Sequence, residues 1–402
     1  FFQIPMRPVP PDDDEYSVRK IRSKLKFSKE KIKIIKALEL LIIDEISMVR
    51  ADVIDFVDRV LRSYSDRKNE PFGGKQLLLV GDIFQLEPVV TSDMRTILSR
   101  YYENYFFFNA KAYEKVDLVA IELKKIYRQN NPHFVEILDR IRINKALDAD
   151  LRDINSRYAA RNDFSNEDFT ITLAARKDTV DAINDAKLEA IPGDEYTFHG
   201  EIEGDFPEKL LPTDMELVLK VNAQVIFLKN DKNHRWVNGT IGKIHSISHN
   251  AVMVELESGD IHAIEPFTWH NIKYTYDEAK KQIKEELLGS FTQYPIKAAW
   301  ALTIHKSQGL TFNRVVIDLG GGAFSSGQTY VALSRCTSLE GITLNSVLSR
   351  RDIIVNKTVV DFSKRFNDNL LISRSLDNAK ADMLYRQALK SFDELKINDS
   401  GR

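Results

Sequence analysis

The chain has 402 residues, of which 43% are hydrophobic and 29% are charged, and its formal net charge at pH 7 is −2. This composition is that of an ordinary soluble protein, and no apolar run approaches the roughly 20 residues that a membrane-spanning helix needs. The near-neutral charge argues against a uniformly basic nucleic-acid coat, although a basic groove is compatible with it.

The length exceeds what one hydrophobic core usually holds, so we expect at least two domains. The single cysteine, Cys336, excludes an internal disulfide framework and fits the reducing cytoplasm. The chain begins at Phe1 without an initiator methionine or a signal-peptide pattern, and we interpret Phe1 as the edge of a fragment.

The first 37 residues begin with a proline-rich, acidic stretch and continue with a basic one. Lys and Arg dominate residues 19–36, and Ile32, Ile34 and Ile35 form a partial apolar stripe among them. Two interpretations stay open for this segment, namely a solvated helix face and a DNA-contacting wedge.

A first α/β unit follows. Aliphatic runs at 40–43, 77–80 and 118–123 predict parallel strands that helices cover on both faces, and residues 53–64 and 92–102 have helical spacing. Because ligands of such sheets bind at the carboxyl ends of the strands, we expect a site at Asp44, Glu45, Asp82 and Gln85.

A second α/β unit starts near residue 129. It has a predicted strand at 169–173 and a helix at 179–189, and it resumes with strands at 298–302 and 315–318. Between these halves, short strands at 224–228, 240–247, 251–256 and 261–264 predict a small inserted β-barrel. Residues 366–402 have a polar, helical pattern, and we expect them to pack on the second unit.

The acidic pair Asp44 and Glu45 has the chemistry that a magnesium nucleotide requires. One carboxylate can hold Mg²⁺ through water, and the next can orient or deprotonate the attacking water. By itself such a pair is more often a surface feature at a strand end. In the next predicted loop, the amide of Gln85 could sense a γ-phosphate, and Asp82 could cap the turn.

Arg128 and Arg335 are candidates for stabilising charge on a transferred phosphoryl group, because a guanidinium binds two oxygens at once and stays charged in a closing cleft. An isolated arginine is usually part of a surface ion pair. The polar segment 303–311 offers side chains and backbone N–H groups that suit sugar–phosphate contacts without reading bases.

Five strings carry a resemblance to a known family: LLIIDEIS at 40–47, GDIFQLEPV at 81–89, KIYRQ at 125–129, IKAAWALTIHKSQGLTF at 296–312 and GQTYVALSRC at 327–336. In this order they resemble the motifs of superfamily 1 DNA helicases of the Pif type, which are related to RecD. The family usually has a second proline where this chain has Glu87.

The resemblance implies an α/β fold of two RecA-like parallel-sheet domains, the first one truncated, with an SH3-like β-barrel inserted in the second. The implied segments are a basic wedge-like subdomain at 1–37, the first RecA-like domain at 38–128, the second at 129–204 and 291–365, the barrel at 205–290 and a C-terminal helical segment at 366–402.

The resemblance also implies residue roles. Asp44, Glu45, Gln85, Arg128 and Arg335 would serve catalysis, with Asp44 holding magnesium through water. Gln308 and Gly309 would border ATP, and DNA contacts would come from Thr303, His305, Lys306, Ser307, Lys177 and Asn238. For Asn238 we favour the alternative interpretation of a plain hairpin turn with Gly239.

The implied activity is ATP- and Mg²⁺-dependent translocation on single-stranded DNA in the 5′-to-3′ direction, coupled to duplex unwinding at DNA junctions. We expect a cytoplasmic monomer, associated with the nucleoid if the protein is bacterial. The residues themselves do not separate DNA from RNA.

The sequence contains no G-x-x-x-x-G-K-[ST] phosphate-binding loop. We interpret the chain as an incomplete remainder whose loop was truncated, omitted or supplied by another chain. Two alternatives stay open: a RecD-like accessory subunit of a nuclease complex, and a catalytically silent DNA-binding module.

Overall fold

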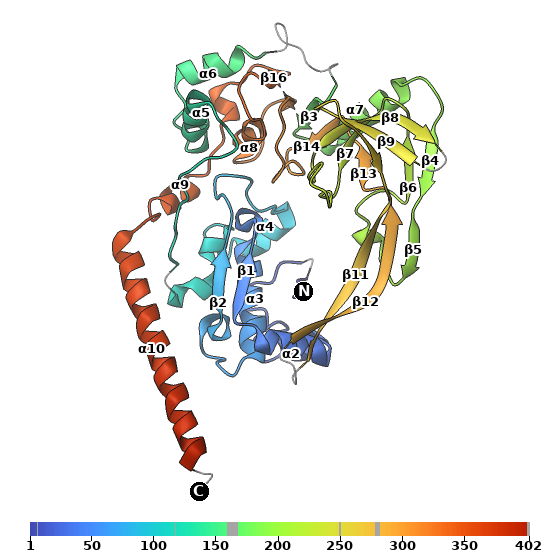
Figure 1. The fold of residues 1–402 in the computed structure, drawn as a ribbon. Coiled ribbons are helices and arrows are strands. Elements are labelled where there is room, and N and C mark those ends of the chain that lie inside the picture. Colours follow the sequence, from blue (N-terminus) through green and yellow to red (C-terminus); the bar gives the residue numbers. More distant parts are fainter. Residues whose placement is uncertain (6, 117, 159–167, 249–250, 278–281, 400–402) are drawn as a thin grey trace.

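The computed structural model describes residues 1–5, 7–116, 118–158, 168–248, 251–277 and 282–399. Figure 1 shows two α/β bodies, antiparallel strands along one side of them, and a long helix that projects beyond one body. We call the α/β unit around β1 and β2 the first body and the unit around β3 and β15 the second body. No described helix combines the length and apolar character that crossing a bilayer demands.

The first body holds a two-stranded parallel sheet beside a buried helix. Its elements are α1 (Ile21–Lys24), α2 (Lys29–Ala37), β1 (Leu40–Ile43), η1 (Ile46–Met48), α3 (Ala51–Tyr64), η2 (Pro71–Gly74), β2 (Gln76–Leu79), α4 (Ser92–Leu98), η3 (Phe107–Asn109) and η4 (Lys111–Lys115). Ile54 and Phe56 of α3 are fully buried in its core. Phe106 and Phe107 are buried in the same core.

The expected coverage of this sheet on both faces is wrong. Burial alternates along β1 and β2, and Ile42 and Leu78 are 57% and 47% exposed. Aliphatic composition specified the strands, but one face of the sheet has no described element packed against it.

The strand predicted at 118–123 is also not formed. This segment is extended, but it joins no sheet among the described residues, and Leu123 is 90% exposed. A strand needs a neighbouring ladder of backbone groups, and β1 and β2 pair only with each other.

The N-terminal 37 residues are part of the first body's core. Val9, Ile21 and Ile35 are buried in it together with side chains of α3. The basic residues of this segment lie around that apolar contact, so the segment is anchored to the first body.

The second body holds a four-stranded parallel sheet in the order β14-β3-β15-β16. Its strands are β3 (Ile171–Ala174), β14 (Ala301–Thr303), β15 (Val315–Asp318) and β16 (Ile342–Leu344). Its helices are α5 (Pro132–Arg142), α6 (Asp148–Asn155), α7 (Lys177–Ala190), α8 (Gln328–Ser334) and the short η6 (Arg350–Asp352). The strand predicted at 315–318 is confirmed.

Antiparallel strands fill the segment between the halves of the second body. They are β4 (Tyr196–His199), β5 (Glu201–Gly204), β6 (Glu216–Leu219), β7 (Gln224–Phe227), β8 (Ile241–Ser248), β9 (Ala251–Leu256), β10 (Ile261–Ile264) and β13 (Ile296–Ala298), with η5 (Glu208–Leu210) between β5 and β6. The four predicted short strands correspond to β7 to β10. The SH3-like character of this insertion stays a prediction.

The sequence analysis missed a long hairpin formed by β11 (Phe267–Asp277) and β12 (Gln282–Gln293). Lys and Glu are frequent in this region, which hides the alternation that marks a strand. The hairpin extends from the insertion to α2 of the first body (Figure 1).

The C-terminal segment does not pack on the second body as expected. Val359 and Phe362 of α9 (Lys357–Ser363) are buried in the core of the first body, where the ring of Phe362 stacks on Phe108 at a centroid distance of 4.1 Å. The following α10 (Asn369–Asp399) runs along the first body, where Ala379 and Met383 line a pocket with Gln76, and then extends beyond it (Figure 1). Leu370 at its start is 85% exposed. The apolar residues of α9 fit the aromatic core of the first body, which decides where the segment docks.

Candidate active site

Two carboxylates follow β1 at the edge of the first body. Glu45 has left-handed backbone dihedrals, with φ 50°, and its N–H donates to Asp44 Oδ1 at 2.8 Å. Burial raises the pKa of Glu45, the negative charges of Asp44 and Asp82 raise it further, and the positive charge of Arg335 opposes them. The carboxylates of Asp44, Glu45 and Asp82 and the guanidinium of Arg335 therefore lie close enough to influence the charge on Glu45.

The turn after β2 lies at the same edge because β1 and β2 are parallel. Asp82 Oδ1 accepts a hydrogen bond from the N–H of Phe84 at 3.0 Å, as expected for a residue that caps the turn. Gln85 Nε2 donates to Asp82 Oδ2 at 3.4 Å, which holds the amide beside the carboxylates.

Arg335 ends α8 and is buried, with 1% of its surface exposed. Its guanidinium donates to the carbonyl oxygens of Val331 and Leu310 and to Ser334 Oγ. Burial lowers its pKa to about 10, with a further contribution from the positive charge of Arg128. No carboxylate among the described residues forms an ion pair with it, although the charges of Asp82 and Glu45 favour its charged form.

Arg128 lies beside Arg335, on the side of the site that the second body forms. Its Nε donates to Thr311 Oγ1 at 2.9 Å and its Nη1 donates to the carbonyl oxygen of Ser334 at 3.2 Å. Burial lowers its pKa as well. The two guanidiniums therefore concentrate positive charge opposite the carboxylates.

The two walls belong to different bodies and meet in direct contacts. Tyr330 of α8 donates its hydroxyl to Asp82 Oδ2 at 3.0 Å, and Gln308 Nε2 donates to Gln85 Oε1 at 3.4 Å. The charge of Asp82 also favours the charged form of Arg335. A hydrogen-bonded path thus runs from Gln308 of the second body to Asp82 and Gln85 of the first.

The predicted DNA-facing segment after β14 has a mixed arrangement. Lys306 is exposed, Thr303 Oγ1 accepts from the Lys306 N–H at 3.2 Å, and burial lowers the pKa of His305, which keeps it neutral at pH 7. Ser307 is fully buried and donates its hydroxyl to the carbonyl oxygen of Ile304, so a DNA contact through its side chain does not fit this structure.

Gly309 has φ 76°, and open space surrounds the position that a Cβ would occupy. The left-handed backbone, not a close neighbour, is therefore the reason for glycine at this position. It is the exposed end of the turn that carries Gln308.

The remaining DNA-side candidates lie outside this cluster. Lys177 starts α7 and forms an exposed ion pair with Asp181. The Asn238 N–H donates to Asn230 Oδ1 at 2.7 Å, and Gly239 has φ 90° with its Cα against Leu310. The geometry at 238–239 supports the turn interpretation.

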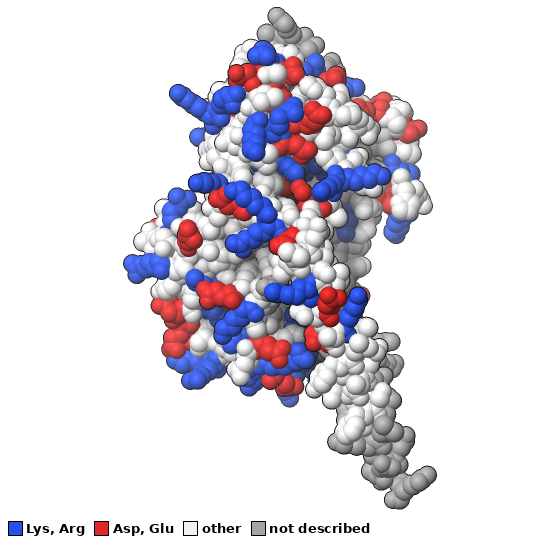
Figure 2. Space-filling model, turned by 90° about the vertical axis from the view of Figure 1, so that its left-hand side faces the viewer, with Lys and Arg blue, Asp and Glu red and all other residues white. Residues whose placement is uncertain are grey.

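The surface charge is evenly mixed on the face that Figure 2 presents, where Lys and Arg side chains alternate with Asp and Glu over both bodies. On that face, neither the positive nor the negative side chains form a large continuous area, in keeping with the net charge of −2.

Magnesium fits the carboxylate wall. Among the described residues, no three His, Cys, Asp or Glu side chains form a metal-binding group. Burial is the main cause of the raised pKa of Glu45, and the negative charges of the nearby Asp44 and Asp82 add to it. A hydrated Mg²⁺, which keeps several water ligands and needs only one or two carboxylates, suits such a site.

Sequence reasoning missed three residues of the cleft. Tyr330 links the bodies, Arg142 of α5 places its guanidinium 5.2 Å from the ring centroid of Phe84, and Gln129 donates to the carbonyl oxygens of Ser334 and Cys336. Tyr330 and Gln129 lie inside strings that were singled out for their arginines. No sequence signal marked Arg142.

Comparison with known proteins gives matches along most of the chain. A family model described as PIF1-like helicase matches residues 1–155, and a model described as helicase matches residues 217–361. The ATP-dependent DNA helicase PIF1 of Xenopus laevis is 32% identical over 315 residues, which are 75% of this chain and 46% of that relative. The chain thus spans about half the length of the vertebrate relatives it matches.

Solved structures of Bacteroides Pif1 are also similar. The complex with ADP-AlF4 is 37% identical with a TM-score of 0.80 and covers 90% of this chain and 81% of that one. The complex with single-stranded DNA is 39% identical with a TM-score of 0.62 and covers 90% of this chain and 82% of that one. The unliganded structure has a TM-score of 0.79 at similar identity and coverage, so the present arrangement of domains is closer to the structures without DNA than to the complex with single-stranded DNA.

Proposed function

Because this chain belongs to the PIF1-like helicases, we propose that the protein is an ATP-dependent DNA helicase. It couples ATP hydrolysis to 5′-to-3′ movement on single-stranded DNA and to duplex unwinding. The observation that carries this proposal is the joint site of the two bodies, in which the carboxylates beside β1 and β2 face the buried guanidinium of Arg335.

The domain assignment is part of the proposal. The first RecA-like domain comprises 38–128 with the wedge-like subdomain 1–37, the second comprises 129–204 and 291–365, and an SH3-like barrel lies at 205–290. The alternative view of the basic stretch 19–36 as a solvated helix face stays open, because its apolar residues are buried in the first core while most of its Lys and Arg residues are exposed.

In the proposed reaction, Asp44 would hold Mg²⁺ through water, and Glu45 would accept a proton from the attacking water. The raised pKa of Glu45 makes its carboxylate a stronger base. Bound Mg²⁺ neutralises charge on the phosphates. Arg128 and Arg335 donate to the oxygens of the transferred group, and Gln85 aligns the water or the γ-phosphate.

The proposed DNA path runs over the turn after β14. Thr303 and Lys306 are accessible there, and the neutral imidazole of His305 can donate or accept one hydrogen bond. Lys177 lies at the start of α7 and supplies a further phosphate contact. Such contacts fix the backbone of a single strand without reading its sequence. Bacteroides Pif1 has been solved bound to single-stranded DNA.

A second candidate is a DNA-binding module without ATP turnover. The 402 residues contain no Walker-type loop to hold the β- and γ-phosphates, so these residues by themselves lack those phosphate contacts. Both candidates use the same DNA path. They differ in whether Asp44, Glu45 and Asp82 support ATP hydrolysis.

The test measures ATP hydrolysis with and without single-stranded DNA, and DNA binding by fluorescence anisotropy. DNA-stimulated turnover that Glu45→Gln abolishes, while the exposed control Glu103→Gln does not, supports the helicase. Binding without turnover supports the module. If Lys306→Ala leaves DNA affinity unchanged, the proposed path is wrong; we expect a loss that is larger than for the exposed Lys364→Ala.

A further inference from the structure

The turn that follows β2 is buried in two different cores. Ile83 and Phe84 are 8% and 6% exposed and belong to the core of the first body. Leu86, two residues after Phe84, is fully buried in the core of the second body, among side chains of α5 and α8. The backbone of this short turn therefore connects the two cores directly.

The second body also packs tightly on the backbone of the turn. Gly327 caps α8 with φ 76°, and a Cβ at this position would lie 2.3 Å from the carbonyl oxygen of Gln85. No side chain fits into this gap. The guanidinium of Arg142, which pairs with Glu122 at 2.9 Å, covers the ring of Phe84.

Asp82 is the polar centre of the turn. Its Oδ1 accepts from the Phe84 N–H, and its Oδ2 accepts from Gln85 Nε2 and from the Tyr330 hydroxyl. Burial raises the pKa of Tyr330, and so does the charge of Asp82, so the phenol remains a donor throughout the physiological range. Tyr330 contacts both cores from its place between them.

We propose that the Asp82–Leu86 turn is a staple that fixes the two bodies to each other, and that Tyr330 is the positioning residue that holds the side chain of Gln85 toward the cleft through Asp82. Leu86 anchors the staple in the second body, and Ile83 and Phe84 anchor it in the first. The inference deepens the proposed function, and it rests on that proposal only where it assigns Gln85 to the nucleotide.

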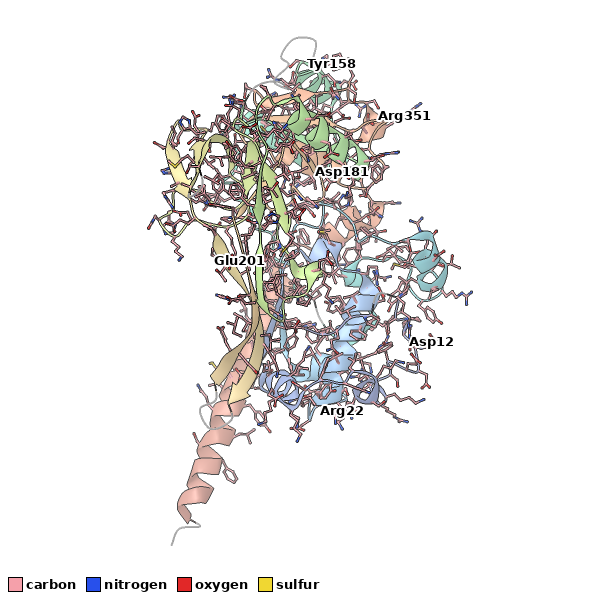
Figure 3. All side chains as sticks on the ribbon, turned by 90° about the vertical axis from the view of Figure 1, so that its right-hand side faces the viewer. Asp12, Arg22, Tyr158, Asp181, Glu201 and Arg351 are labelled. Carbon is pink, nitrogen blue, oxygen red and sulfur yellow. The ribbon has the colours of Figure 1, made fainter. Side chains whose placement is uncertain are left out.

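The experiment measures the distance between the bodies without nucleotide or DNA. Figure 3 shows Asp12 on the first body and Arg351 on the second, and both are exposed, so Asp12→Cys and Arg351→Cys accept a fluorophore pair for single-molecule energy transfer. Cys336 is buried and stays unlabelled. The readout is the fraction of molecules in which the bodies are apart.

We expect Tyr330→Phe and Asp82→Ala each to raise the separated fraction about tenfold, since each removes a hydrogen bond to a charged group. The effects of the two substitutions should be non-additive. Asp82→Asn should rescue in part, because its single amide oxygen can accept from Tyr330 while its NH2 group replaces the oxygen that accepts from the Phe84 N–H. The matched control is Tyr113→Phe, which removes a buried hydroxyl that has no hydrogen-bond partner.

A role confined to general stability predicts a different pattern: Tyr330→Phe would lower the unfolding midpoint and leave the separated fraction of folded molecules unchanged. That result overturns the proposal, and so does an equal effect of Tyr113→Phe. Since the readout uses neither ATP nor DNA, a failed hydrolysis test of the proposed function leaves this measurement intact, and the two failures are distinguishable.

Discussion

The parallel sheets of the two bodies differ in how their faces are covered. In the second body, β3 and β15 lie at the centre of four strands and are almost entirely buried, whereas residues of β1 and β2 alternate between half-buried and exposed. Leu173 is fully buried and Ile42 is 57% exposed, although both are aliphatic strand residues. Composition specifies a strand, but the packed neighbours determine how much stability each residue contributes.

The largest effect should come from the covered sheet. Leu173→Ala should lower the free energy of unfolding by about 2–5 kcal/mol, because it leaves a cavity in a close-packed core. Urea denaturation monitored by tryptophan fluorescence measures this loss of stability. The signal suits a variant of the second body because Trp236, Trp269 and Trp300 all lie outside the first body. Leu173→Met is the volume-conserving control. A loss below about 1 kcal/mol for the alanine variant would contradict the comparison.

Arg335→Met should have the opposite effect and raise the free energy of unfolding. The pKa of Arg335 is lowered to about 10, so its charged form is disfavoured in the folded state, and this penalty is fully present at pH 7 and is relieved as pH rises above about 10. Allowing for the lost hydrogen bonds, the variant should be about 1–2 kcal/mol more stable at pH 7 and less so at pH 10.5. A destabilised variant at pH 7 would show that the guanidinium's hydrogen bonds outweigh its burial.

Glu45→Gln should have a smaller effect in the first body. The pKa of Glu45 is raised, so the folded state binds more protons than the unfolded chain just above the ordinary pKa of glutamate, and wild-type stability falls as pH rises through that window. The variant should gain less than about 1 kcal/mol at pH 7, since Glu45 is partly exposed. Thermal melts at pH 4 and pH 7 check this, and a gain that is larger at pH 4 would reverse the sign.

The smallest effect should come from the uncovered face. Ile42→Thr keeps the β-branched shape and should change the free energy of unfolding by no more than about 0.5 kcal/mol. Its neighbour Ile43, which packs against the first core, provides the control, and Ile43→Thr should cost clearly more. Circular dichroism melts of both variants measure the difference. Equal costs would mean that the exposed face is covered in solution.

Local sequence patterns predicted several helices, and several strands that pair with a strand nearby in the sequence. The strands at 251–256, 261–264 and 315–318 were found because alternation or continuous apolarity is a local property. The carboxylates and amide at the ends of β1 and β2 followed from the parallel arrangement. The hydrogen bonds of the cleft then show which of these groups meet.

The features that were missed depend on distant partners. The segment 118–123 has strand composition but no ladder, and α9 docks in the other body. The β11–β12 hairpin is an exception, because its strands are neighbours in the sequence and were missed only because charged residues obscure their alternation. The burial of Ser307 and the contact of Tyr330 with Asp82 likewise depend on tertiary packing, which local sequence patterns do not specify.

The docking of α9 has a consequence for the timing of folding. The rings of Phe107 and Phe108 are synthesised early, but Phe362, which packs against both, follows only after the whole second body. During synthesis the N-terminal region leaves the ribosome with an aromatic surface whose cover does not yet exist. Closing a contact over such a sequence separation is slow. The nascent chain therefore presents a hydrophobic target for chaperones until α9 emerges.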